Sequence, residues 1–397
     1  MIKHVKTSVF ILFASLVLST PLLVAYFTNE KYETPKVFFV YSIGLTIMFL
    51  FSVYRVFAVK NKKLVFPHKP ALAFLCASVL STIFSTHFYT SFWGYYTRFN
   101  DSLFSYLIFF GIYFVAINFL NTAQKRILLD LTLLTLLPTG AYGLYQIMLG
   151  VPRIYSTFGQ PNWYAAYLIM LLPLVMYKII STRNKLFWSV LFLLGVANLV
   201  YTASLSGIAG FIISTSFFIV YFGKKLNPHI VFFLLCVFLL FGVLKADYIK
   251  NKLVDAVNLS GDSTQYALSD PGYVRLGLWK SGLKIAVSSP KNFLIGTGLE
   301  TFAYQLPFYR DNSLNYSSEW NYILNKPHNY YLEVFIESGI LGLVSYLALL
   351  IWSMLQKDKV LVAGLLGFYV SNFFGFPTIY TNLLFWLWLA FNTDTAR

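Results

Sequence analysis

Long apolar stretches, of roughly 17 to 23 residues each, recur from one end of this 397-residue chain to the other. A helix needs about 20 apolar residues to cross a hydrocarbon core about 30 Å thick. Only 11% of the residues are charged, whereas a soluble domain averages about 25%. Most of the chain therefore has no water to face. Strands of a membrane barrel would alternate in segments of about ten residues, and no such alternation is found. The sequence predicts an all-α polytopic membrane protein.

The apolar stretches predict about twelve transmembrane helices. An even number of spans places both termini on the same side of the membrane. The predicted spans lie near residues 8–28, 36–58, 70–86, 102–120, 127–149, 163–180, 187–203, 207–222, 229–246, 330–352, 360–376 and 382–393.

Positive charges gather after the even-numbered spans, as Lys60, Lys62, Lys63, Lys69, Lys125, Arg126, Arg183, Lys185, Lys224, Lys225, Lys357 and Lys359. Lysine and arginine are enriched in cytoplasmic loops, so both termini are predicted to be cytoplasmic. The formal net charge is +15. Because this charge is scattered over short loops, it argues against a nucleic-acid-binding protein.

One connection, residues 247–329 between the ninth and tenth spans, is much longer than the others and falls on the outer side. The chain is therefore predicted to be a single membrane domain, 1–397, with one large extracytoplasmic loop that carries short helices. Within the loop, apolar residues from Val274 to Ile285 have the spacing of an amphipathic helix lying on the membrane surface. Ser289 and Pro290 should end that helix.

His328 and Asn329 stand where this loop meets the next apolar stretch. Histidine can take up and release a proton near neutral pH, so His328 could act in catalysis. An ordinary polar role at the membrane interface is an equally good interpretation of this residue. Glu333 and Glu337 follow, four residues apart, and so share one face of the predicted helix. Carboxylates at membrane depth are costly and are usually functional.

Arginine stays charged and binds phosphate through two parallel hydrogen bonds. The predicted outward arginines are Arg98, Arg153, Arg275 and Arg310. Contact with lipid headgroups is the plainer alternative for each of them.

The segment from Ser156 to Asn162 is a second polar stretch, in which Pro161 suits the first position of a helix. No phosphate-binding loop and no zinc-ligand spacing appears in the sequence, so no cofactor and no metal is predicted.

Seven short motifs resemble, in order, those of the O-antigen ligase and O-antigen polymerase superfamily of membrane glycosyltransferases. This superfamily also includes bacterial protein O-oligosaccharyltransferases. The motifs are Trp93 to Arg98, Tyr142 to Gln146, Ser156 to Asn162, Arg275 with Trp279, Gly296 to Phe302, His328 to Leu332, and Glu337 to Gly342.

The resemblance implies a GT-C-like enzyme of the bacterial inner membrane that takes part in lipopolysaccharide biosynthesis. Such an enzyme moves a glycan from an undecaprenyl pyrophosphate carrier to an acceptor hydroxyl, here lipid A–core, on the periplasmic face. It would act with inversion and without a metal or ATP. His328 is the expected general base, and Arg275 is expected to stabilise the pyrophosphate with help from Arg98 and Arg153.

The remaining predicted substrate-binding residues are Asn329, Tyr330 and Glu337, of which Glu337 either orients His328 or holds the start of the helix. One stretch departs from the family pattern. Residues Thr202 to Gly207 lack the arginine of the usual Ser-Arg-Gly-like motif, which leaves Arg153 and Arg98 as the nearest replacements.

Three other functions stay open. Within the class, an O-antigen polymerase would use a second lipid-linked glycan as acceptor, and a protein O-oligosaccharyltransferase would use a serine or threonine. Outside the class, a secondary transporter or lipid flippase would require inverted repeats and ionisable groups near the midplane of the bilayer. No internal repeat is visible in the sequence.

Overall fold

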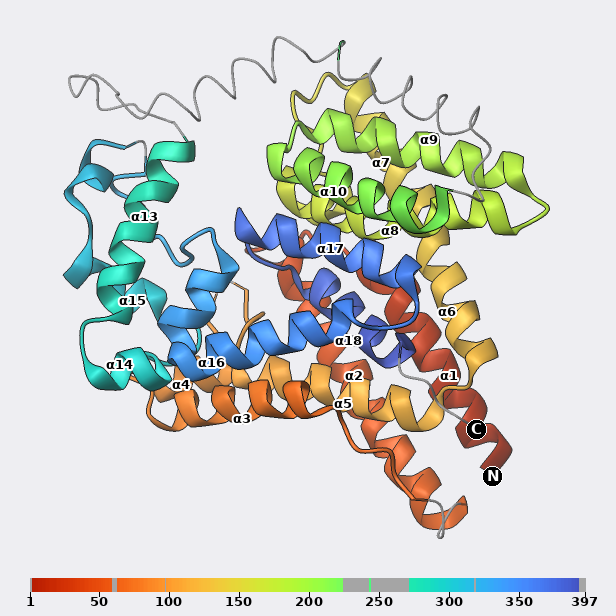
Figure 1. Cartoon of the computed structure of the whole chain (residues 1–397), viewed down its shortest axis with the longest axis horizontal. Coiled ribbons are helices and arrows are strands. Elements are labelled where there is room, and N and C mark those ends of the chain that lie inside the picture. The colour runs from red at the N-terminus through yellow and green to blue at the C-terminus, as the bar shows by residue number, and fades with distance from the viewer. Residues whose placement is uncertain are drawn as a thin grey trace.

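The computed structural model describes residues 2–58, 63–96, 98–223, 243, 271–317 and 319–392. Regular structure in those residues consists of helices and contains no β-strand (Figure 1). The predicted all-α class is therefore confirmed.

The first half of the chain forms a run of helices joined by short connections. They are α1 (Ile2–Ser19), η1 (Thr20–Leu22), α2 (Glu33–Ala58), α3 (Lys69–Ile83), α4 (Phe88–Trp93), α5 (Leu103–Phe119), α6 (Thr122–Leu134), α7 (Leu136–Met148), η2 (Ser156–Phe158), α8 (Pro161–Ser181), α9 (Lys185–Thr202) and α10 (Leu205–Phe222).

The second half begins with a group of shorter helices and returns to long ones. They are α13 (Pro271–Ala286), α14 (Pro290–Ile295), α15 (Phe302–Tyr309), η4 (Asn312–Tyr316), α16 (Tyr330–Met354), α17 (Lys359–Phe373) and α18 (Ile379–Asn392). Helices α13, α14 and α15 stand together at one end of the molecule, beside the first residues of α16 (Figure 1).

Seven helical stretches in the described residues are long and apolar enough to cross a membrane, and three shorter apolar helices accompany them. One of the seven, Thr122–Met148, combines α6 and α7. Every predicted span except the ninth overlaps a described helix. The ninth, 229–246, lies outside the described residues apart from Val243, as does the first part of the long loop, 247–270.

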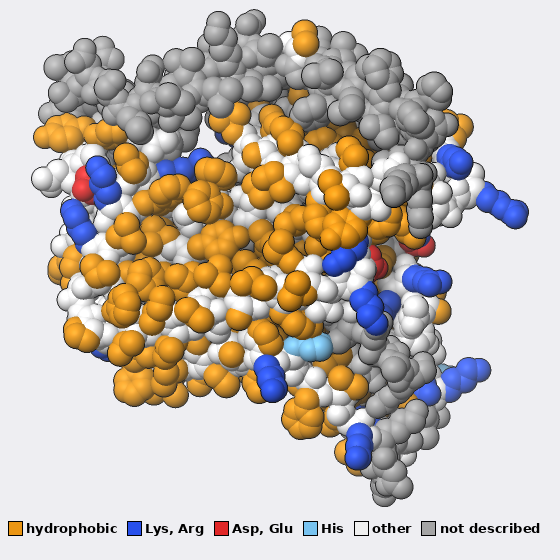
Figure 2. Space-filling model, in the orientation of Figure 1, with side chains coloured by type: hydrophobic (Ala, Val, Ile, Leu, Met, Phe, Trp, Pro, Cys, Tyr) orange, Lys and Arg blue, Asp and Glu red, His pale blue; other side chains and the backbone are white. Residues whose placement is uncertain are grey.

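Helices α8 and α18 lie at the centre of the bundle. Both are apolar around their whole circumference. Most side chains of α8 and nearly all of those of α18 are buried, as expected for helices surrounded by other helices. The outer helices expose large apolar side chains instead. Figure 2 shows these side chains as a broad hydrophobic area with lysine and arginine side chains toward its two ends. A surface with this pattern suits a lipid bilayer.

The predicted fifth span, 127–149, is divided into two helices that meet at Thr135. Pro138 explains the division. It has no backbone N–H to donate to the carbonyl of Leu134, and its ring crowds that carbonyl.

Helix α16 is interrupted at Gly339, whose φ of 66° and ψ of −169° are not helical. The break frees backbone carbonyl groups inside the bundle, where each must find a donor. The loop after α14 supplies two: the amide of Thr297 donates to Ile336 O over 3.0 Å, and that of Gly298 donates to Glu337 O over 3.0 Å. The Ser81 hydroxyl also donates to Glu337 O, over 2.5 Å. The break thus fixes the outer loop against α16.

The predicted amphipathic helix is present as α13, and it ends at Ala286, before Ser289 and Pro290. Leu276 and Leu283 are exposed, whereas Val274, Leu278 and Ile285 are buried in a small core shared with α15, η4 and α16. This face of α13 packs against the protein itself, so it attaches the outer loop to the bundle.

Candidate functional site

His328 lies just before α16, in a backbone conformation that non-glycine residues rarely adopt. Its φ is +56°, in the left-handed region, where strain costs about 1–3 kcal/mol and is concentrated at functional sites. Asn329 then caps the helix, because its side-chain oxygen accepts a hydrogen bond from the amide of Leu332 over 3.0 Å. Glu300, which belongs to the surroundings of His328 described below, has a positive φ value as well.

Phe376, in the connection between α17 and α18, brings His328 and Arg98 together. The His328 ring centroid lies 5.5 Å from that of Phe376, and the Arg98 guanidinium carbon lies 4.6 Å from the same ring. Arg98 also stacks on Trp163, at 4.7 Å, near the start of α8. One atom of this guanidinium, Nη1, is buried and has no hydrogen-bond partner among the described residues. A buried arginine donor without a partner is suited to an anion.

Arg275 approaches the same place from α13. It lies one helical turn before Trp279, so the two side chains share a face. The indole Nε1 of Trp279 donates to Pro327 O over 3.1 Å, and this bond holds that face of α13 beside His328. Burial, with the positive charges of Arg275 and Arg98, lowers the pKa of His328 to about 3. The imidazole is therefore neutral at pH 7 and has a lone pair available.

A buried cluster of charges lies next to these three residues. The Lys326 ammonium is 2.9 Å from Asp101 Oδ2 and 2.9 Å from Glu300 Oε1, and it also pairs with the Glu333 carboxylate. All four side chains are at most 2% exposed. Burial disfavours the lysine charge, but the surrounding carboxylates outweigh it and hold the pKa of Lys326 well above its usual value. Lys326 is also 5.9 Å from the Phe376 ring.

Arg153 is one step removed from His328. Its Nε donates to Thr202 O over 3.1 Å, and its Nη2 donates to Asn162 Oδ1 over 3.2 Å. Arg153 therefore joins the turn before α10, where the expected family arginine is missing, to the start of α8. The next residue, Trp163, stacks on Arg98. These contacts make Arg153 a support for the Arg98 position.

The other predicted substrate-binding residues have contacts within the protein. Tyr330 is buried, and its hydroxyl lies 2.8 Å from that of Tyr106. Glu337 is 2% exposed, and its Oε1 has no hydrogen-bond partner in the described part of the chain. Asn329 is engaged as the helix cap. Their roles toward a substrate stay predictions.

Arg310, the fourth predicted outward arginine, holds the outer loop together. Its Nη2 donates to Trp320 O over 2.9 Å.

Sequence reasoning missed Lys326, Asp101, Glu300 and Phe376. A signal for Lys326 alone was available: the loop places it a few residues before Glu333, and a carboxylate at membrane depth needs a cation. Among the described residues, no group of three or more His, Cys, Asp or Glu side chains is arranged to hold a metal ion. The three carboxylates around Lys326 share its ammonium instead.

One region of the chain is similar to a known protein family. The family model described as O-antigen ligase matches residues 189–347, a region that contains α13 with Arg275 and the start of α16 with His328. No curated protein matches the chain. The match covers less than half of the chain, and it supports the resemblance to the O-antigen ligase superfamily that the sequence motifs carry.

Proposed function

We propose that this protein is an O-antigen ligase-type glycosyltransferase of the bacterial inner membrane. In this proposal it transfers a glycan from undecaprenyl pyrophosphate to a hydroxyl group of lipid A–core, on the periplasmic side of a chain with about twelve spans and cytoplasmic termini. The observation that carries the proposal is the convergence of Arg98 and Arg275 on the buried imidazole of His328.

The two arginines serve the leaving group. As the bond between the anomeric carbon and the pyrophosphate oxygen breaks, negative charge develops on the pyrophosphate. Fixed guanidinium groups stabilise that charge more in the transition state than in the ground state. The partnerless Nη1 of Arg98 supports this role. Arg153 acts indirectly, through Asn162 and Trp163.

His328 serves the acceptor. The acceptor oxygen attacks the anomeric carbon, its proton passes to the imidazole, and undecaprenyl pyrophosphate leaves with the bonding electron pair. Attack from the side opposite the leaving group inverts the anomeric centre.

Donor binding makes His328 a better base. With a pKa of about 3, the free imidazole is a weak proton acceptor. A bound pyrophosphate places negative charge beside the same two arginines, and a nearby negative charge favours the protonated imidazole. The base therefore gains strength only when the donor is in place.

An apolar groove supports the lipid half of the donor. It has a volume of about 480 Å³ and lies between α16 and α17. Tyr331, three residues from His328, and Phe373, which packs against Trp279 at 5.9 Å, line it. An isoprenoid chain in this groove would leave its pyrophosphate next to Arg275. The arginines supply the positive charge for this group, so we propose that no metal is required.

The test is glycan transfer by the purified full-length protein in lipid nanodiscs, with a lipid-linked glycan as donor. Three acceptors are offered in turn: lipid A–core, a second lipid-linked glycan and a serine-containing protein. Product with lipid A–core alone supports the ligase, whereas product with either other acceptor alone replaces it by polymerase or protein glycosylation. Transfer should survive thorough chelation of metals.

Two variants connect the activity to the site. His328→Gln and Arg275→Gln should each lower transfer about 10²-fold or more. His87→Gln and Lys280→Gln are matched controls, because both replace exposed side chains on the same part of the molecule, and both should transfer normally. Full activity in His328→Gln would exclude the proposed base.

A further inference from the structure

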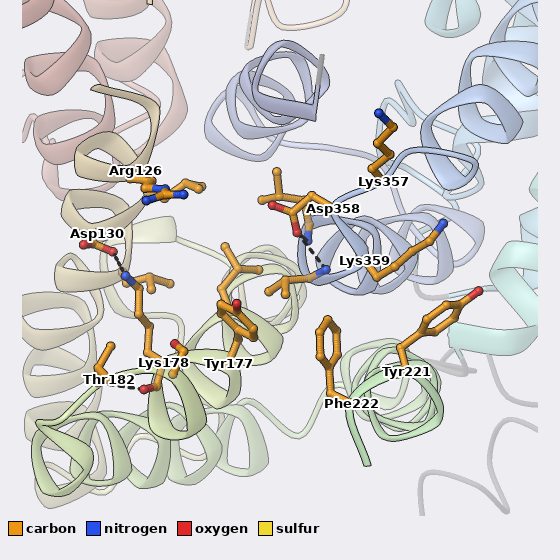
Figure 3. A pocket seen from close by; sticks show the side chains of 16 residues that line it. Arg126, Asp130, Tyr177, Lys178, Thr182, Tyr221, Phe222, Lys357, Asp358 and Lys359 are labelled. Atoms are coloured by element: carbon orange, nitrogen blue, oxygen red, sulfur yellow. Dashed lines mark hydrogen bonds and ion pairs between the residues drawn. The ribbon is translucent and has the colours of Figure 1, made fainter. Parts of the chain in front are cut away.

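A second cavity lies at the opposite end of the bundle from His328. Its volume is about 810 Å³, and it is lined by one side of α6, by the ends of α8 and α10 and by the start of α17 (Figure 3). Helix α16 separates the two places, with His328 before its first residue and Lys357 beyond its last. Its 25 residues, even with the break at Gly339, keep the two places on the order of 30 Å apart at about 1.5 Å per residue. The cavity therefore serves neither the proposed base nor the proposed pyrophosphate-binding arginines.

The cavity carries an excess of positive charge. Four cationic side chains line it together with only two carboxylates. Asp130 is paired with Lys178, and Asp358 accepts hydrogen bonds from the amides of Val360, at 3.0 Å, and Leu361, at 3.3 Å, as the cap of α17. Both carboxylates are thus already engaged. The four cations are Arg126, Lys178, Lys357 and Lys359.

The cations reach this space from separate elements. Figure 3 shows Arg126 on α6, Lys178 on α8 and Lys359 at the start of α17 around one opening. Lys359 also lies over the Tyr221 ring of α10, at 5.6 Å. Three segments distant in the sequence therefore supply the charged rim, and α10 adds an aromatic ring beside it. The rim is thus more than the exposed face of a single helix.

The rest of the lining is apolar. Leu129, Leu133 and Leu174 contribute to it, and Phe222 adds an aromatic ring. A free inorganic ion gains nothing from such a surface, whereas the glycerol and the first part of the acyl chains of a phospholipid would bury apolar area against it. Basic pockets between transmembrane helices are a known kind of binding site for anionic headgroups.

We propose that this cavity binds the phosphate group of an anionic phospholipid, in the leaflet opposite to the proposed transfer site. The phosphate lies among Arg126, Lys178 and Lys359, and the glycerol and upper acyl chain lie on the leucines. By the distribution of positive charge in the loops, this leaflet is the cytoplasmic one. The site is independent of the donor and acceptor, and so of the proposed transfer activity.

Native mass spectrometry of the full-length protein in detergent tests the proposal. Phosphatidylglycerol is titrated into the wild type, into the double variant Arg126→Gln/Lys359→Gln and into the control Arg183→Gln/Lys185→Gln. The control removes the same charge from exposed residues at the same end of the bundle that do not line the cavity. We expect the first bound phosphatidylglycerol to be about tenfold weaker in the cavity variant and unchanged in the control. The charge-conserving variant Arg126→Lys/Lys359→Arg should bind nearly as well as the wild type, which separates loss of charge from loss of folding.

Equal binding of phosphatidylglycerol by the cavity variant and the wild type would overturn the proposal. Short-chain phosphatidylglycerol and inorganic phosphate, used as competitors, distinguish the two sources of a phosphate group. The proposal requires the short-chain lipid to compete at much lower concentration than the ion. Equal competition would make this a site for free phosphate and reject the lipid. Glycan transfer should be the same in all four proteins.

Discussion

Lys326 places its ammonium nitrogen 2.9 Å from a carboxylate oxygen of Asp101, although 225 positions separate the two residues in the chain. The same nitrogen lies 2.9 Å from the Glu300 carboxylate. Asp101 precedes α5, Glu300 belongs to the outer loop, and Lys326 stands two residues before His328. This one ammonium therefore joins the outer loop to the membrane helices immediately beside the proposed base.

Replacing Lys326 by methionine should destabilise the protein strongly. Several carboxylates would then be buried together without their cation, and breaking a buried ion pair by removing one partner costs about 3–5 kcal/mol. We expect a large drop in the midpoint of thermal unfolding in detergent, together with loss of transfer. Lys280→Met, an exposed lysine on α13, is the control and should unfold close to the wild-type temperature. Equal unfolding temperatures for both variants would mean that the cluster does not hold the loop.

The pH dependence of transfer should report the effect of the donor on His328. The pKa of His328 is about 3 in the free protein, because of burial and of the charges on Arg275 and Arg98. A base works when it is unprotonated, so kcat/KM, which reflects the free enzyme, should not fall through protonation of His328 between pH 7 and pH 5. Bound pyrophosphate raises the pKa, so the acid limb of kcat should lie at higher pH than that of kcat/KM.

Initial rates measured from pH 4.5 to 8 give the acid limb of kcat when the donor is saturating, and that of kcat/KM when the donor is limiting. An ordinary histidine would make kcat/KM fall below about pH 6.5, and that result would contradict the placement of both arginines beside His328. In His328→Gln, the residual rate should lack the acid limb seen in kcat.

The break in α16 depends on close backbone contact at Gly296. A Cβ atom at this position would lie 2.2 Å from the carbonyl carbon of Glu337, and the φ of +79° already disfavours a side chain. Gly150 is a matched control, because its φ of +72° is similar and no atom lies within 4 Å of its Cβ position. Gly150→Ala should cost about 1–2 kcal/mol, from backbone strain alone. Gly296→Ala should cost a further ~1–3 kcal/mol, from forced displacement of α16.

Thermal unfolding and transfer assays on both alanine variants separate the two effects. Equal stabilities would show that the loop and α16 are not in contact at this point. Because the displaced residues include Glu337, we also expect Gly296→Ala to transfer more slowly than Gly150→Ala.

Features that depend on a short stretch of sequence could be predicted from the sequence alone. Apolar length predicts most of the helices, since the bilayer fixes the length of a span. The junction at His328 was also found locally, because polar residues there meet an apolar stretch that contains Glu333 and Glu337. Pro161 suits the first position of a helix and likewise predicts where α8 begins. In the structure, Gln160 caps that helix.

Features that depend on distant contacts were not predicted. Asp101, Glu300 and Lys326 form one cluster only because α5, the outer loop and α16 fold together, and nothing in their local sequence shows this. The interruption of α16 at Gly339 was missed for a similar reason. A glycine in an apolar stretch is tolerated in a transmembrane helix, and only the loop amides of Thr297 and Gly298 make the break stable.

Trp279 is the link by which α13 positions Arg275, so it offers a test that leaves both charged residues in place. Trp279→Phe retains an aromatic ring beside Phe373 but loses the hydrogen bond from Nε1 to Pro327 O. One hydrogen bond contributes about 0.5–1.5 kcal/mol to stability, so unfolding should change little. Transfer should fall more, by about tenfold, because small displacements of a positioning group are costly in rate. Trp320→Phe, an exposed tryptophan of the same loop, is the control. Unchanged transfer in Trp279→Phe would show that Arg275 is positioned without this contact, whereas a slow enzyme of normal stability would place Trp279 among the positioning residues.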